Sequence, residues 1–597
     1  MFLNAVKNGV FFRTLLILYF AYLLLSRVAY LNADLPLWEF NIEEKATAYN
    51  ARNMVLFGDA SSGGRDYEPR VSSPLPYLLS CLSFLLMGVS LVSLRLPYAL
   101  LSVAAIFLFY KVLRKETNPW FALLGTVLLG SSQFVVALNR SAVAENLFIL
   151  LMAAAFYFFR NFVENKKTIF AFLFGLFAAL NLSVKYSGIH FLLVCGTGIL
   201  LYALAERKNP SAAGRPVLLF TAGSALSLIL PGAALLWGRG NGALKTIGWL
   251  CKDNLAFDHE TFLHNLNFEL PLFFLRLFPF VLLIALTGLF LIVLFRLRPL
   301  SKTDAFALLW LTLGIVSSLF GFLYYKRLIF LILPVVYLAV KTAYGMWRYL
   351  KEPDPPQEGK IGGWRGETIR TAGLTALWWG FSLLIAPSVL FVLTFYFGAH
   401  NGKILHATML AAYMLLPVTN LVCQWIASRN FSRFTASDLK RWLVGGGFCF
   451  FIAASVFSLA ANEINDTNIF LNPKNLAFQS FENSRDLGKI LGPNTTVIGS
   501  EMAFRILGFD NKCKFLFNHD GSIDPFAAYK KDVADILSAK DPRYFCLILD
   551  YKLGLSALVE FQLSMEKINR HYPRLRLVKT YPFMNSSLFL FDKYGRP

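Results

Sequence analysis

Residues 143–160 read VAENLFILLMAAAFYFFR, an apolar run with one carboxylate, Glu145, near its start and one arginine, Arg160, at its end. An apolar helix of about 20 residues is long enough to cross the hydrocarbon core of a bilayer. Comparable runs recur along most of the chain and predict about thirteen membrane-spanning helices. The predicted spans lie at 11–30, 94–113, 118–138, 143–160, 167–184, 186–205, 216–237, 270–295, 305–323, 328–346, 371–397, 404–427 and 442–461.

The composition also indicates a membrane protein with many spans. Of the 597 residues, 56% are hydrophobic and 16% are charged, and the mean hydropathy is +0.53. Soluble domains carry roughly 25% charged residues. The net charge of +21 does not indicate nucleic-acid binding, because Lys and Arg form small clusters between the apolar runs, where they set membrane topology.

Residues 75–90 decide the orientation of all the later spans. Their apolar run is short and is opened by Pro74 and Pro76, and runs of that length are more often interfacial or re-entrant than spanning. If they do not span, about 24 Lys and Arg lie on the cytoplasmic side and about 15 outside, in agreement with the positive-inside rule. The amino terminus is then expected inside and the carboxyl terminus outside.

Residues 462–597 differ from the rest, because they are rich in Asn, Asp, Lys and Pro. Short apolar runs at 496–498 and 545–549 predict buried strands, and amphipathic stretches near 523–539 and 554–571 predict helices. This alternation predicts a small α/β domain, which the topology places outside the membrane.

We therefore expect two domains. The first is a transmembrane domain over residues 1–461, whose first outer loop at 31–93 carries interfacial helices. The second is the extracytoplasmic α/β domain over residues 462–597. The seven cysteines are scattered and lack the CxxC or Cys/His spacing of a zinc or redox centre.

With this topology, the outer loops hold carboxylates and isolated cations close to the lipid boundary. Ionisable groups held against a bilayer are costly and are functional candidates by default. Carboxylates can accept a proton from a hydroxyl or bind a metal, and Arg and Lys can bind phosphate. Together they suit a reaction on a lipid-borne phosphate, although any single cation could be a headgroup anchor. The residues are Glu43, Glu44, Arg52, Arg70, Arg140, Glu145, Lys185, Lys326 and Arg327.

Three motifs follow one another in the first outer loop: Glu43-Glu44, then Ala51-Arg52-Asn53-Met54, then Gly58-Asp59. Their order resembles the first outer loop of the GT-C superfamily of polyprenyl-phosphate-sugar-dependent glycosyltransferases. That superfamily includes protein O-mannosyltransferases and the lipid A aminoarabinose transferase. Similar motifs continue at Ser73-Pro74-Leu75-Pro76-Tyr77, at Arg95-Leu96-Pro97, from Arg140 to Glu145, over 182–188, and at Lys326-Arg327 with Leu333-Pro334.

The chain departs from the family pattern at three positions. Glu43 and Glu145 stand where the family usually has Asp, and Ser72 stands before the proline pair, where a basic residue is frequent. Arg70 is the nearest substitute for that basic residue. These departures bear on the identity of the substrate more than on the class of reaction.

The resemblance implies a mostly α-helical, polytopic GT-C fold. It implies transfer of a sugar from a polyprenyl-phosphate carrier to a lipid, glycan or protein acceptor on the outer face, with inversion at the anomeric carbon. The protein is then expected in a bacterial cytoplasmic (inner) membrane, with its site and its C-terminal domain on the periplasmic side.

The same resemblance implies roles for the outer residues. Glu43 is the expected general base and Glu44 orients it or binds a metal, although which of the two points inward is left open. Glu145 is a second acidic group for acceptor positioning or metal binding. No cofactor is certain, and a divalent metal ion on Glu43 and Glu145 is left open. The cations implied for the carrier phosphate are Arg52, Arg70, Arg140, Lys185, Lys326 and Arg327.

Two other classes of function are compatible with a polytopic chain. A transporter or flippase needs polar groups near the middle of the membrane, whereas the predicted spans are nearly free of charge. A structural assembly subunit would tolerate loss of the outer carboxylates. The sequence names neither the sugar nor the acceptor.

Overall fold

The structure is a computed structural model. It describes residues 10–33, 38–58, 73–185, 187–206, 210–229, 232–233, 262, 301–318, 325–351, 444–445, 448, 479–492, 495–499, 504, 509–516, 542–550, 555–583 and 586–594. The spans predicted at 270–295, 371–397 and 404–427 and the helix predicted near 523–539 lie outside these residues.

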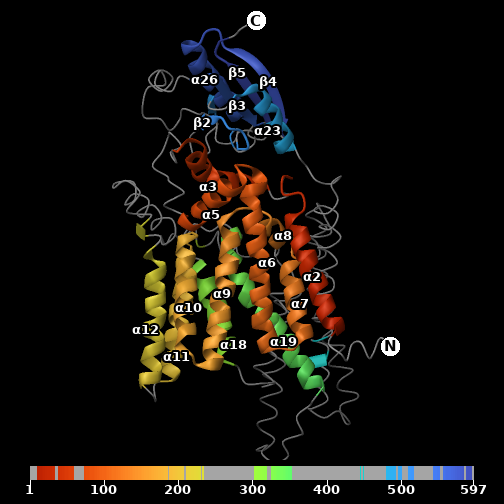
Figure 1. The fold of residues 1–597 in the computed structure, drawn as a ribbon, viewed down its shortest axis with the longest axis vertical. Helices are drawn as coiled ribbons and strands as arrows, with labels where there is room; N and C mark the ends of the chain where they lie inside the picture. Colours follow the sequence, from red (N-terminus) through yellow and green to blue (C-terminus); the bar gives the residue numbers. More distant parts are fainter. Residues whose placement is uncertain are drawn as a thin grey trace, which may run out of the picture.

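A bundle of helices lies below a small C-terminal sheet (Figure 1). Five helical segments within the described ranges are long and apolar enough to cross a membrane, and they identify an integral membrane protein. These segments are Val10–Val28, Leu91–Glu116, Ala144–Asn165, Gly188–Ala205 and Leu328–Lys351. Each agrees with a predicted span.

Capping residues and prolines mark where several helices of the bundle begin. Ser90 begins α6 with a capping box in which its hydroxyl accepts from the Ser93 backbone N–H, and Asn118 caps α7 ahead of Pro119. The elements are α2 (Val10–Val28), α3 (Trp38–Phe57), α5 (Pro74–Met87), α6 (Leu91–Glu116), α7 (Pro119–Gly130), α8 (Gln133–Asn139), α9 (Ala144–Asn165), α10 (Thr168–Leu180), η1 (Asn181–Ser183), α11 (Gly188–Ala205), α12 (Pro210–Ser227), α18 (Lys302–Ser318), η3 (Tyr325–Leu331) and α19 (Ile332–Lys351).

Helix α5 corresponds to the short run at 75–90. Prolines at its first and third positions start it, and Gly88, with φ +77°, ends it. Its 14 residues span about 21 Å at 1.5 Å per residue, less than the roughly 30 Å of a bilayer core. Figure 1 shows α3 and α5 together at the end of the bundle beneath the C-terminal sheet, so neither of these two helices crosses the bundle.

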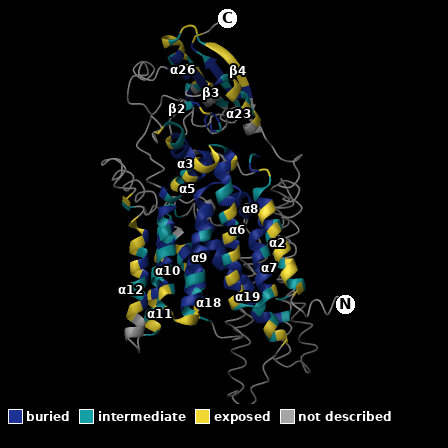
Figure 2. Ribbon diagram, viewed as in Figure 1, coloured by how far each residue is buried: buried dark blue, intermediate teal, exposed yellow. Residues whose placement is uncertain are grey.

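Helix α9 lies at the centre of the bundle. Its described residues are mostly buried, whereas α12 at the periphery is largely exposed (Figure 2). Phe156 contacts Trp310 and Tyr337 edge-on, with ring centroids 5.7 Å and 5.1 Å apart. Because α9 is fixed by this aromatic core, the polar residues at its start are held in a defined position.

Helices α10 and α12 approach until their backbones touch. A Cβ atom added at Gly175 would lie 2.1 Å from the carbonyl oxygen of Phe220, and one added at Gly223 would lie 2.1 Å from that of Phe172. Ser224 donates its hydroxyl to the Gly175 carbonyl at 3.2 Å. Such small-residue contacts are a common way for helices to associate in a bilayer.

The C-terminal domain contains a five-stranded mixed sheet in the order β2-β1-β3-β5-β4. Strand β1 pairs in parallel with β2 and β3, and β5 pairs antiparallel with β3 and β4. The elements are α23 (Gln479–Ile490), β1 (Thr496–Gly499), β2 (Lys514–Leu516), β3 (Tyr544–Asp550), α26 (Leu555–His571), β4 (Arg576–Phe583) and β5 (Ser586–Asp592). The strands predicted at 496–498 and 545–549 and the helix predicted near 554–571 are confirmed.

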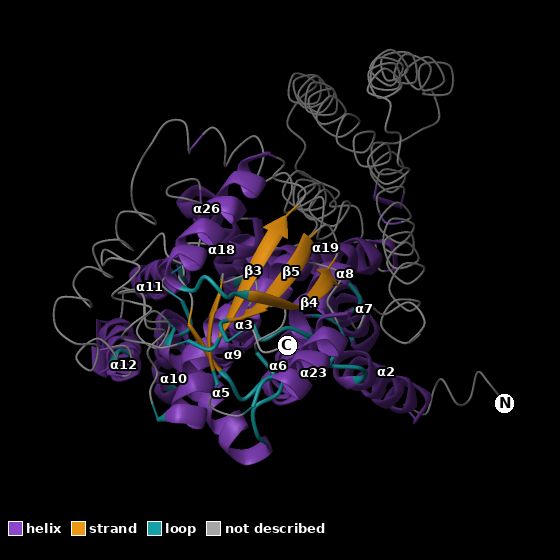
Figure 3. Ribbon diagram, turned by 90° about the horizontal axis from the view of Figure 1, so that it is seen from above, coloured by secondary structure: helices purple, strands orange, loops and turns teal. Residues whose placement is uncertain are grey.

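Seen from above, the sheet lies over the bundle, with α26 and α23 beside it (Figure 3). Buried Phe545 and Leu547 of β3 pack in one cluster with Ile568 of α26. The sheet thus forms a small core of its own at the end of the bundle where α3 and α5 lie.

Candidate functional site

The second carboxylate of the acidic pair, Glu44, is fully buried in a network of hydrogen bonds. The Nε of Arg95 in α6 donates to both Glu44 oxygens at 3.0 Å, and the backbone N–H of Ala142 donates to Oε2 at 3.0 Å. Arg95 also donates to the carbonyls of Leu31 and Ala33 at 2.6 Å. Glu44 therefore ties α3 to α6 and to the segment that leads into α9.

This network separates the roles of the two neighbouring carboxylates. Buried carboxylates that bind Arg bidentately are held firmly in one orientation, so Glu44 is suited to position α3 rather than to accept a proton from a substrate. Glu43 precedes it in α3, about 100° further round the helix. The side chain of Glu43 lies outside what the structure describes.

Glu145 and Lys185 form an ion pair at the same end of the bundle. Lys185 Nζ lies 2.5 Å from Glu145 Oε1. The Glu145 side chain is fully buried, while that of Lys185 is 21% exposed. Within the described residues, Glu145 Oε2 is buried and has no hydrogen-bond partner. The pair joins the first turn of α9 to the corner between η1 and α11, and leaves one carboxylate oxygen available.

Several other buried polar atoms that have no partner among the described residues lie near the start of α9 or between η1 and α11. Most buried polar groups in proteins are hydrogen-bonded, and the exceptions can mark the site of a bound water or a ligand. These atoms are both amide atoms of Asn139, Oδ1 of Asn146 and of Asn181, and the hydroxyls of Ser183 and Ser187. The neighbourhood of Glu145 and Lys185 is therefore polar enough to bind a hydroxyl-bearing ligand or water.

Arg140 is buried and binds backbone carbonyls. Its Nη1 donates to Ser26 O at 2.7 Å and its Nη2 to Tyr30 O at 3.1 Å, which fixes the end of α2. Arg140 thus ties α2 to the segment that precedes α9, and its role at the carrier phosphate stays a prediction.

Arg52 likewise binds protein groups, in this case from the C-terminal domain. Its Nε donates to Phe509 O at 2.8 Å, and its Nη2 donates to Cys513 O at 2.9 Å and to Asn511 O. Burial lowers the pKa of the guanidinium below its ordinary value. Its predicted role at the carrier phosphate is not supported by this position.

The remaining predicted cations are only partly described. Lys326 and Arg327 belong to η3, which packs beside α9, but their side chains lie outside the described part of the chain. Phe330 of η3 stacks on His190 of α11, with ring centroids 6.2 Å apart. The backbone of η3 therefore lies near the first turn of α11, close in sequence to Lys185. Arg70 lies outside the described residues.

The structure does not favour a metal ion at Glu145. Among the described residues, no group of three or more His, Cys, Asp or Glu side chains could hold one. The neighbour of Glu145 is the ammonium group of Lys185, a cation that competes for the same oxygen. The predicted metal site on Glu43 and Glu145 stays a prediction, because the Glu43 side chain is not described.

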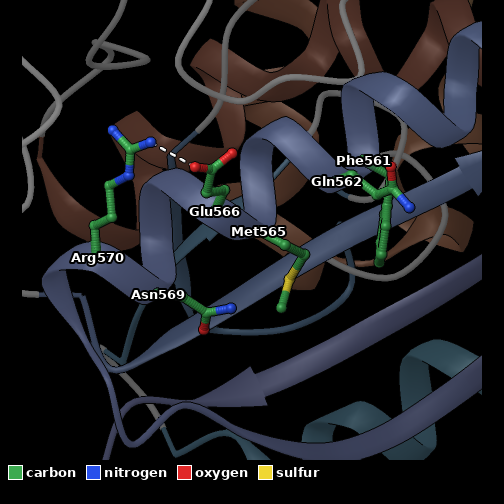
Figure 4. A pocket seen from close by; sticks show the side chains of 6 residues that line it. All are labelled: Phe561, Gln562, Met565, Glu566, Asn569 and Arg570. Atoms are coloured by element: carbon green, nitrogen blue, oxygen red, sulfur yellow. Dashed lines mark hydrogen bonds and ion pairs between the residues drawn. The ribbon is translucent and has the colours of Figure 1, made fainter.

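A hollow of about 560 Å³ lies on the C-terminal domain, away from these carboxylates (Figure 4). It is lined by Phe561, Gln562, Met565, Glu566, Asn569 and Arg570 of α26. None of the predicted site residues lines it, and it is open to solvent. We do not assign it to the reaction.

Sequence reasoning gave no role to Arg95, although the Arg95-Leu96-Pro97 motif contains it. The signal available in the sequence was an arginine within the apolar run 94–113, where a buried charge needs a partner. The structure identifies that partner as Glu44.

The described part of the chain is thus a helical membrane bundle with buried carboxylates at the end that lies under a small sheet. Residues 71–237 match the family model of dolichyl-phosphate-mannose-protein mannosyltransferases. A search of curated proteins by sequence returned no match. The family match covers less than half of the chain, and it agrees with the resemblance to the GT-C superfamily seen in the sequence.

Two solved structures share the fold over nearly the whole chain. ArnT from Cupriavidus metallidurans bound to undecaprenyl phosphate is 13% identical, with a TM-score of 0.53, and the match covers 98% of each chain. The same protein in the apo state is 12% identical, with a TM-score of 0.55 and 99% of each chain covered. The chain is therefore similar to ArnT in its fold.

Proposed function

We propose that this chain transfers a sugar from a polyprenyl-phosphate carrier to an acceptor at the end of the bundle that lies under the C-terminal domain. The ArnT of similar fold was solved with undecaprenyl phosphate, which supports a polyprenyl-phosphate donor here. In this proposal that end is the periplasmic face of a bacterial inner membrane. Residues 1–461 form the membrane domain with about thirteen spans, and residues 462–597 form the extracytoplasmic domain.

The observation that carries the proposal is the Glu145–Lys185 pair. A lysine side chain that is 21% exposed can keep its carboxylate partner and still present N–H donors to a phosphate, because an ammonium group has three donors. Lys185 would bind the carrier phosphate and stabilise the negative charge that develops there as the sugar leaves. Oε2 of Glu145 would accept a hydrogen bond from a hydroxyl of the sugar or the acceptor.

Glu43 acts as the general base in this proposal. Its carboxylate takes the proton of the acceptor hydroxyl, and the acceptor oxygen bonds to the anomeric carbon. The bond between that carbon and the phosphate oxygen breaks, and its electron pair stays with the departing polyprenyl phosphate. Attack opposite to the leaving group inverts the anomeric carbon. If the acceptor is itself a phosphate, no base is needed and Glu43 only positions it.

Glu44 supports this chemistry without taking part in it. Through Arg95 and the Ala142 backbone, it fixes α3, and hence the backbone of Glu43, relative to the start of α9. Lys326, Arg327 and Arg70 are proposed as further contacts of the carrier phosphate or of the headgroup region.

The test is transfer of label in membranes that contain the protein. Polyprenyl-phosphate carriers bearing a labelled sugar are supplied, and lipid, glycan and protein fractions are analysed for the label. Wild type and Arg570→Met, an exposed control on α26, are expected to move the label into one acceptor class, and Lys185→Met is expected to move much less. Label that crosses the membrane while still attached to its carrier would identify a flippase and refute the proposal.

A further inference from the structure

A turn of the C-terminal domain, residues 509–513, is buried against the membrane domain and is called the 509–513 turn below. Phe509 and Cys513 are 1% exposed. The ring of Phe509 lies 6.1 Å from that of Phe84 in α5. The side-chain amide of Asn511 donates to Ser484 O at 3.1 Å, which anchors the turn to α23 of its own domain.

On the α3 side, this turn is bound by Arg52. The guanidinium donates to three carbonyls of the turn, those of Phe509, Asn511 and Cys513. Its carbon also lies 5.5 Å from the ring of Phe504. The guanidinium is a planar fork of five N–H donors, and a lysine cannot reproduce that geometry.

On the α6 side, the turn is bound through Asp510. Its Oδ1 accepts from the backbone N–H of Leu91, the first residue of α6, at 2.7 Å. A carboxylate at the N-terminus of a helix is favourable both for the unpaired N–H groups and for the helix dipole. Arg95, the partner of Glu44, lies one turn further along α6.

The 509–513 turn therefore binds both α3 and α6, the two helices that the Glu44–Arg95 ion pair also joins. Arg52 lies eight residues after Glu44 in α3, about 12 Å along the helix. Helix α3 is thus fixed to α6 at two separated points, once through a buried ion pair and once through the C-terminal domain. Two separated points fix the direction of a helix, which a single contact cannot do.

We infer that the C-terminal domain positions α3 for catalysis through Arg52 and Asp510. This inference rests on the proposed function, in which α3 carries the base Glu43. Arg52 and Asp510 are positioning residues, because they bind protein groups and act on the reaction through α3. Loss of either contact should disturb the placement of Glu43 without removing any group that binds the donor.

The test compares Arg52→Met and Asp510→Asn with Arg570→Met, which removes an exposed guanidinium from α26 in the same domain. Amide hydrogen exchange of peptides from α3 is measured together with kcat and the KM for the polyprenyl-phosphate sugar. Asp510→Asn is nearly isosteric and keeps all the hydrogen bonds of Arg52. It therefore provides a second test of the inference if Arg52→Met does not fold.

We expect exchange in α3 to be about tenfold faster or more in Arg52→Met, which loses three charge-assisted hydrogen bonds to the turn. The increase should be smaller in Asp510→Asn, where a neutral amide oxygen replaces the charged acceptor of the Leu91 N–H. We expect kcat to fall by about 10- to 100-fold, because a displacement of the base by about 1 Å can reduce the rate that much. The KM for the donor should stay within about twofold of the wild-type value. Arg570→Met should change neither measurement.

Two results would overturn the inference. Unchanged exchange in α3 would show that the turn does not hold that helix, whatever the enzyme activity. A raised donor KM with unchanged kcat for Arg52→Met would make Arg52 a donor ligand. Because exchange is read without substrate, it tests the positioning contact even if the proposed reaction is wrong.

Discussion

Replacement of Arg95 by methionine tests whether the Glu44 network holds the membrane domain together. Arg95 binds both Glu44 oxygens at 3.0 Å and the carbonyls of Leu31 and Ala33 at 2.6 Å. Both members of the pair are essentially unexposed, at 1% and 0%. Removal of one partner from a buried ion pair leaves an uncompensated charge and costs about 3–5 kcal/mol. We expect Arg95→Met to lower the free energy of unfolding by that amount.

The matched control is Arg570→Met. Arg570 pairs with Glu566 on α26, where the two side chains are 77% and 56% exposed. Exposed pairs of this kind contribute about 0.2–1 kcal/mol, so the control should stay close to wild type. The double variant Glu44→Gln with Arg95→Met should recover part of the loss, because it no longer buries an unpaired carboxylate.

The assay is denaturant unfolding in detergent micelles, followed by tryptophan fluorescence and extrapolated linearly to zero denaturant. If Arg95→Met unfolds within about 1 kcal/mol of the wild type, as an exposed pair would, the network is not the structural tie described above. Glu44 would then have to be reconsidered as a residue of the reaction.

Three further predictions concern the reaction and the topology. Glu43→Gln should lower the transfer rate by about 100- to 10,000-fold at normal expression; near-normal turnover would remove Glu43 as the base. Lys185→Met should raise the donor KM by roughly tenfold or more, since a charge-assisted hydrogen bond of about 1.5–3 kcal/mol is lost, and Lys185→Arg should keep part of the affinity. An unchanged KM would leave Lys185 as a headgroup anchor. A reporter that is active only in the cytoplasm should stay silent when fused after Pro597; a bright signal would reverse the positive-inside assignment.

Elements whose signal is local in the sequence could be predicted. The apolar run at 143–160 became α9 (Ala144–Asn165), and the amphipathic stretch near 554–571 became α26 (Leu555–His571). Length and periodicity decide such elements, because the bilayer or the sheet fixes how long an apolar run must be. Helix α3 has no such apolar pattern, and its burial depends on polar contacts with distant residues.

Two residues of the predicted site lie together in the structure, but the partners of the predicted arginines could not be found from the sequence. The sequence brought Glu145 and Lys185 to the same side of the membrane, and the structure shows that they pair. It could not show that Arg52 meets the carbonyl of Phe509, which lies 457 residues away. Carbonyl groups occur at every residue, so a cation that binds them leaves no pattern in the sequence.

Helices α10 and α12 pack tightly together as one unit at the side of the bundle. With a Cβ at Gly175 only 2.1 Å from a facing carbonyl, and with Ser224 and Ser227 donating across to α10, neither helix can slide along the other without breaking hydrogen bonds in a medium that offers no replacement. A gap wide enough for a lipid chain cannot open between them. Any lateral entrance to the bundle must therefore lie between other helices.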